Sequence, residues 1–130
     1  NLVAHLRERA EAEKTSNVVP VLASRDTPRL ARSSVDLVLL VDTWHHLDHR
    51  RDYLGLLARA LKPGGRVAVV EWKPGPAPVG PKEEDHKVPR EQVIREMEAT
   101  GFRLVAEPVG LPWQYHLQFA RPPAAAGNDR

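Results

Sequence analysis

The sequence contains no cysteine, few aromatic residues and almost no net charge. Without cysteine, the 130-residue chain can form neither a disulfide nor a thiolate metal site. The formal charge is only +2, and no basic stripe with interleaved aromatic residues is present, so nucleic-acid binding is not expected. No apolar run reaches the length of a membrane span and no signal peptide is visible, which favours a cytoplasmic protein without membrane contact.

What the first third of the chain does contain is apolar patterning. Residues 2–10 place Leu, Val and Ala on one face, which predicts an amphipathic helix. Residues 18–22 read as a short strand, and Pro20 restricts that strand to a sheet edge because proline donates no ladder hydrogen bond. Residues 35–41, "VDLVLLV", show no alternation, which predicts a parallel strand buried on both faces.

The middle of the chain predicts a βαβ unit. Residues 53–61 carry apolar side chains at helical spacing, and the sequence "KPGG" at residues 62–65 predicts the end of that helix. Residues 66–72, "RVAVVEW", read as a second buried strand. The short links between these elements predict a right-handed crossover and parallel pairing with residues 35–41.

The last part predicts a loop, a helix and a hairpin. Residues 73–87 are rich in Pro and Gly, which is typical of a lid or a disordered segment. A helix is expected over residues 89–101, and residues 102–108 and 113–120 read as strands of an antiparallel hairpin. We expect one partial domain over residues 1–121 and a disordered tail over residues 122–130.

Three stretches resemble class I S-adenosylmethionine-dependent methyltransferases. The buried run followed by "DTWHHL" resembles the end of that family's fourth strand. The sequence "LARALKPGGRVAVVEW" is similar to the segment leading into the fifth strand, and it is the most specific match. The sequences "VIREMEATGFRLV" and "WQYHLQFARP" resemble the last helix and the last two strands. The resemblance implies a partial Rossmann-like α/β fold, with a mostly parallel sheet and a C-terminal antiparallel hairpin.

The resemblance does not extend to the family's first two strands or to their Gly-rich cofactor loop. No G-x-G sequence is present, and Asn1 corresponds to the helix after the second strand, so the sequence resembles the C-terminal part of such an enzyme. The family's strand order 3-2-1-4-5-7-6 would leave a gap of about 14 Å between residues 18–22 and residues 35–41. Residues 18–22 must then pair directly with residues 35–41, pair with a second copy, or be disordered. Exposed strand edges therefore predict a homodimer or larger assembly.

The resemblance also implies the site. Asp26 corresponds to the position that contacts the adenine amino group of S-adenosylmethionine, and Asp42 and Thr43 to positions beside its methionine part. Trp44 could attract the sulfonium through a cation–π contact. His45 or His46 could accept the proton of a small-molecule acceptor, because imidazole titrates near neutral pH.

Each of these residues also has a structural interpretation. Asp26 could be a turn residue, Asp42 could cap the following helix, Trp44 could be packing, and the histidines could be loop residues. His45 and His49 would share a face if their segment were helical, so a metal site at the cluster of His45, His46 and His49, with Asp42 or Asp48, is a further alternative.

Three functions follow in order of preference. The first is an S-adenosylmethionine-dependent methyltransferase, or the C-terminal portion of one, acting on a small molecule. The second is a non-catalytic remnant of that fold which dimerises or binds a ligand, and the missing Gly-rich loop favours it. The third is the metal site.

Overall fold

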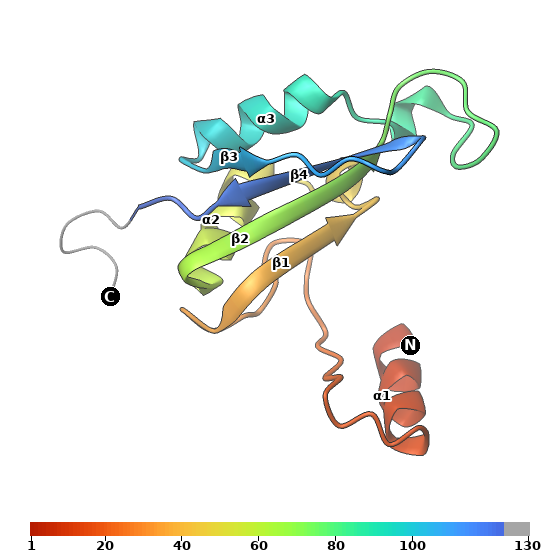
Figure 1. Cartoon of the computed structure of the whole chain (residues 1–130). Helices are drawn as coiled ribbons and strands as arrows, with labels where there is room; N and C mark the ends of the chain where they lie inside the picture. Colours follow the sequence, from red (N-terminus) through yellow and green to blue (C-terminus); the bar gives the residue numbers. More distant parts are fainter. Residues whose placement is uncertain (124–130) are drawn as a thin grey trace.

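The computed structural model describes residues 1–123 and is built on a four-stranded sheet with the order β1-β2-β4-β3 (Figure 1). Its strands are β1 (Val35–Val41), β2 (Leu61–Trp72), β3 (Arg103–Ala106) and β4 (Gln114–Ala120). β1 and β2 are parallel, and β4 is antiparallel to both β2 and β3. The predicted α/β fold, parallel pair and C-terminal hairpin are therefore confirmed. Most of the predicted tail, residues 124–130, lies outside the described residues.

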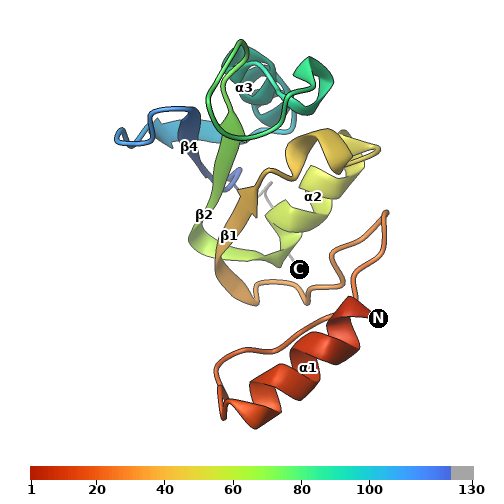
Figure 2. The same cartoon turned by 90° about the vertical axis from the view of Figure 1, so that its right-hand side faces the viewer.

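Helices cover one face of the sheet. α2 (Arg50–Ala60) and α3 (Arg90–Ala99) lie on the same side of it (Figure 2), and short 3₁₀ turns, η1 (Trp44–His46) and η2 (Glu84–His86), follow β1 and β2. The two helices and the inward-facing strand positions form one buried core, which includes Leu54, Leu57, Val67, Val69, Val93, Met97, Leu117 and Phe119. On β4, every second side chain is buried, because Tyr115, Leu117 and Phe119 alternate with Gln114, His116 and Gln118 along the strand.

The connection from α2 to β2 is tighter than the sequence predicts. The helix ends at Ala60 and Leu61 already pairs with Val35, so the glycine pair lies inside the strand rather than at the helix end. A Cβ on Gly65 would stand 2.8 Å from the carbonyl oxygen of Lys62 and 3.2 Å from that of Asp36. Glycine is needed here because two backbones approach each other closely.

The prediction that β1 is buried on both faces is wrong. β1 is an edge strand, and its side chains alternate between the helix-covered face and an uncovered one. Leu37, Leu39 and Val41 are 56%, 60% and 45% exposed. An apolar run without alternation indicates that both faces of a strand can pack against apolar side chains. It does not show that such side chains are present on both faces.

The predicted strand over residues 18–22 is also absent. These residues pair with no strand in the described part of the chain, and Val19 is 77% exposed. The parallel part of the sheet is therefore a single pair. The predicted N-terminal helix is present as α1 (Leu2–Ala12), but it lies apart from the sheet and buries none of its residues (Figures 1 and 2). No helix within residues 1–123 has the length and apolar character needed to cross a membrane.

Candidate functional site

The end of β1 holds Asp42 in a fixed and unusual conformation. Its φ is +52°, a left-handed value that non-glycine residues rarely adopt. The Asp42 amide donates to the carbonyl oxygen of Val70 on β2 at 3.0 Å, and Gln114 Nε2 on β4 donates to Asp42 Oδ1 at 3.1 Å. Three neighbouring strands therefore position this half-buried carboxylate.

Thr43, rather than Asp42, precedes the next turn as its N-cap residue. Its hydroxyl donates back to the Val41 carbonyl oxygen at 2.8 Å and makes no capping bond. The interpretation of Asp42 as a helix cap is therefore wrong, because its side chain is bound to Gln114. What the structure places at the carboxyl end of β1 is a carboxylate and a hydroxyl on consecutive residues.

Trp44 is completely buried beneath this end of the sheet. Its amide donates to Glu71 Oε1 at 2.7 Å, and its indole Nε1 donates to Glu96 Oε2 at 2.9 Å. The indole presents no surface to a ligand in this arrangement. Its contacts match the packing interpretation and give no support to a cation–π contact.

Glu71 is a buried carboxyl group that the sequence interpretation missed. It is 0% exposed, and its Oε2 has no hydrogen-bond partner among the described residues. Burial raises the pKa of Glu71, and the nearby charge of Asp42 raises it further, although the bond from the Trp44 amide opposes them. The available signal was the acid within "VAVVEW", because a carboxylate inside a buried strand requires a specific partner.

A second carboxylate, Glu96 on α3, ties the site to the helical layer. Arg50 at the start of α2 contacts both of its oxygens, Nε to Oε2 at 2.5 Å and Nη2 to Oε1 at 2.9 Å. Burial alone would raise the pKa of Glu96, but the hydrogen bonds that it accepts, chiefly from Arg50, hold the pKa below its usual value. Glu96 therefore accepts from Trp44 and Arg50 together and fixes η1 against both helices.

The two predicted proton acceptors, His45 and His46, are brought together with a third histidine. The ring centres of His45 and His46 are 3.9 Å apart, and His86 from η2 stacks on His45 at 5.1 Å with an interplanar angle of 19°. Burial lowers the pKa of His45, and the charges that His46 and His86 carry when protonated lower it further. A histidine kept neutral at the end of β1 can accept a proton.

Asp26 lies elsewhere. It lines a pocket of about 390 Å³ with Asp48, His49, Asp52 and Tyr53 at the start of α2. The loop carrying Asp26 is held there by an ion pair between Arg25 and Asp48. The structure thus gathers Asp42, Thr43, His45 and His46 at the end of β1, and groups Asp26 with the N-terminus of α2.

The metal alternative requires His45 and His49 on one helical face. They do not share a helix, since η1 ends at His46 and α2 begins at Arg50. Within residues 1–123, no group of at least three His, Asp or Glu side chains is arranged to hold a metal ion. The described residues therefore give the metal site no support.

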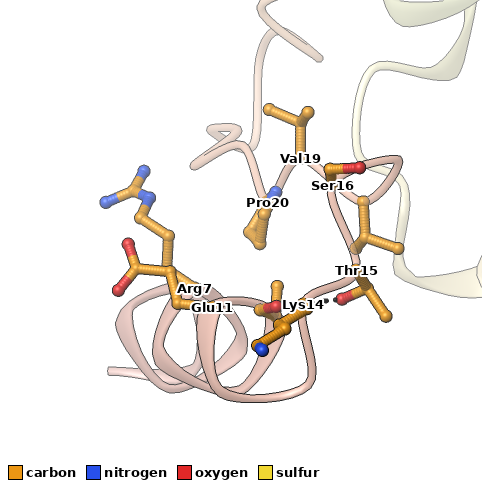
Figure 3. A pocket seen from close by; sticks show the side chains of 9 residues that line it. Arg7, Glu11, Lys14, Thr15, Ser16, Val19 and Pro20 are labelled. Carbon is orange, nitrogen blue, oxygen red and sulfur yellow. Dashed lines mark hydrogen bonds between the residues drawn. The ribbon is translucent and has the colours of Figure 1, made fainter.

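Two other hollows do not contain the predicted residues. One of about 490 Å³ lies between α1 and residues 14–20, with Arg7 and Glu11 on the helix opposite Val19 and Pro20 (Figure 3). It is remote from the strand ends at which open α/β sheets bind ligands. The other, of about 400 Å³, lies beside the β3–β4 connection and shares Gln114 with the Asp42 contact.

The chain matches one protein-family profile, described as a methyltransferase domain, over residues 1–69. That match covers slightly more than half of the chain and includes Asp26, Asp42, Thr43 and the histidines of η1. No curated protein sequence matches the chain.

Solved structures with the same fold are numerous. A SAM dependent methyltransferase from Aquifex aeolicus has a TM-score of 0.84 at 20% identity, covering 92% of this chain and 63% of its own. A Burkholderia thailandensis 1,6-didemethyltoxoflavin-N1-methyltransferase, with bound 1,6-didemethyltoxoflavin and S-adenosylhomocysteine, has a TM-score of 0.67 at 15% identity, covering 91% of this chain and 56% of its own. The [4+2]-cyclase SpnF has a TM-score of 0.71 at 14% identity, covering 92% of this chain and 62% of its own. The chain thus spans less than two thirds of these proteins.

Proposed function

The chain belongs to the methyltransferase family whose domain model it matches, and from that premise we propose that it takes part in methyl transfer from S-adenosylmethionine to a small molecule. The observation that carries the proposal is the fixed carboxylate of Asp42 at the end of β1, beside Thr43 and the histidine stack. Open α/β sheets bind their ligands at the carboxyl ends of their strands.

The residues at this end suit the chemistry. S-adenosylmethionine supplies a positively charged, electrophilic methyl group when it is bound. Asp42 offers a negative charge to that cation. Its backbone is bonded to β2 and its carboxylate to Gln114 on β4, so that little reorganisation is needed on binding. His45, with its pKa lowered, or its neighbour His46 accepts the proton that a hydroxyl or amine acceptor loses.

Asp26 is the further cofactor residue in this proposal. In its pocket with Asp52 and Tyr53 it would accept a hydrogen bond from the adenine amino group, which is a donor. Asp26 and Asp42 would then contact opposite ends of one extended cofactor.

Cofactor binding tests the proposal directly. Titration calorimetry of the chain with S-adenosylmethionine is expected to give a dissociation constant below about 1 mM, which corresponds to about 4 kcal/mol. Asp42→Asn is expected to weaken binding roughly tenfold, about 1.4 kcal/mol. Asp36→Asn is the matched control, because Asp36 is on the same strand with its side chain 84% exposed. Binding weaker than about 1 mM, or equal losses in both variants, would refute methyl transfer by this chain.

The second candidate is a non-catalytic module of the same fold. The observation that favours it is the uncovered apolar row of β1, formed by Leu37, Leu39 and Val41, which suits association better than catalysis. In this proposal a second copy packs on this row and pairs with the edge of β1 that no strand within residues 1–123 occupies, which gives a homodimer. No S-adenosylmethionine binding together with a dimeric mass in light scattering would select this candidate.

A further inference from the structure

Three imidazole rings from two distant turns lie together, and two of them, His45 and His86, are stacked. His45 contacts both of the others: the ring centre of His46 is 3.9 Å away with the rings tilted at 42°, and that of His86 is 5.1 Å away. His46 is its neighbour in sequence, whereas His86 comes from the long loop after β2. The small interplanar angle of 19° means that the rings of His86 and His45 are nearly parallel, in an offset stack.

The chain holds His86 in this position through a closed loop. The side chain of Lys87, only 3% exposed, donates to Glu84 Oε1 at 2.9 Å and also to the carbonyl oxygen of Gly75. The other oxygen of Glu84 accepts from the Gly75 amide at 3.1 Å. These bonds join the two ends of the Pro- and Gly-rich loop, so the loop has a defined form that its composition did not predict.

The loop is also fixed to the end of β2. Gly80 lies so close to the indole of Trp72 that a Cβ there would come within 2.6 Å of the ring. Because Trp72 is the last residue of β2, this contact anchors the loop to the same sheet that carries Asp42. Two independent contacts therefore position His86 beside His45: the hydrogen bonds of Lys87 and the packing of Gly80 on Trp72.

The charged groups around His45 oppose each other. His46 and His86 disfavour a proton on His45, while Asp42 at the end of β1 and Asp85 in η2 favour it. Glu83 lies 3.6 Å from His86 Nδ1. Nδ1 of His45 is buried and has no partner among the described residues, so the ring is kept from solvent on that side.

We propose that His86 is a positioning residue that orients the ring of His45 and keeps it neutral, so that His45 can accept the proton of the methyl acceptor. This inference rests on the proposed function and deepens it. His86 contributes through His45: its stacked ring limits the rotation of His45 and shields one side of it from water, and the charge of His86, when it is protonated, disfavours a proton on His45.

Histidine titration by NMR tests the inference without any cofactor. In His86→Phe a flat ring remains but the charge is gone, and the pKa of His45 is expected to rise by about 0.5 unit. In His86→Ala water also reaches the ring, and a rise of about 1 unit is expected. His5→Phe is the matched control, because His5 is exposed on α1 and outside the stack. His45→Gln identifies the His45 resonance.

The possible outcomes are distinct. A His45 pKa that stays within about 0.2 unit of the wild-type value in both His86 variants, with an unchanged circular dichroism spectrum, would overturn the inference. If His86→Ala unfolds, His86→Phe alone decides. Failure of the proposed function would instead appear as missing S-adenosylmethionine binding, with the His45 shifts intact. In active protein, the acidic limb of the methyl-transfer pH profile is expected to move with the pKa of His45.

Discussion

Removing the carboxylate of Glu96 is expected to destabilise the protein strongly. In Glu96→Ala the indole N–H of completely buried Trp44 loses its acceptor at 2.9 Å. A hydrogen bond from a buried donor to a charged acceptor contributes about 2 kcal/mol. The Arg50–Glu96 pair, in which both side chains are 28% exposed, contributes about 1 kcal/mol after screening by solvent. The expected loss is therefore about 3 kcal/mol.

Urea unfolding followed by circular dichroism measures that loss. A fall of about 3 kcal/mol lowers Tm by roughly 12 °C for a chain of this size. Glu96→Gln keeps an acceptor for Trp44 but loses the charge, so it is expected to fall between the wild type and Glu96→Ala. Glu98→Ala, an exposed position on the same helix, is the control. A loss below about 1 kcal/mol in Glu96→Ala, equal to that of the control, would refute the role given to this network.

Two further changes test other parts of the structure. Burial raises the pKa of Glu71 above 4.5 in the folded state. The contribution of protonated Glu71 to the stability of the protein is therefore fully present below pH 4.5 and is lost as the pH rises through the folded-state pKa. Glu71→Gln keeps the acceptor for the Trp44 amide but cannot ionise, so it does not lose this stability at higher pH. The stability of the variant relative to the wild type is therefore expected to increase with pH in urea unfolding. A stability difference that does not change with pH would contradict this prediction. Leu39→Lys places a charge in the apolar row of β1, where the side chain is 60% exposed. If β1 pairs with a second copy, light scattering is expected to change from twice the chain mass to the chain mass, and a wild type that is already monomeric would exclude this pairing.

Local patterns predicted the elements that depend on their own sequence. The apolar run of β1, the helical spacing of α2 and the alternation of β4 each predicted the right element, and β1 and β4 both found a partner in β2. Residues 18–22 failed as a strand because a strand exists only if a partner supplies hydrogen bonds, and no described strand does. The exposure of Leu39 was missed for the same reason: the sequence shows which faces are apolar but not whether they are covered.

Long-range polar contacts explain the rest of the site. Asp42 was identified from its place after an apolar run, but its bond to Gln114 spans 72 residues and leaves no local pattern. The same holds for Glu71 and Trp44, which are 27 residues apart. The ordered form of the loop before α3 depends on Lys87, whose burial cannot be read from a segment rich in Pro and charge. Residue types indicated the chemistry of the site, whereas its geometry required the fold.

The most direct test is S-adenosylmethionine bound to the chain while the NMR signals of Asp42, Thr43 and their neighbours are followed. If the carboxyl end of β1 is the cofactor site, these signals are expected to shift saturably below about 1 mM ligand, and Asp42→Asn is expected to weaken that response while Asp36→Asn leaves it unchanged. Saturable shifts confined to α1 and residues 14–20, or no saturable shift at all, would contradict the assignment.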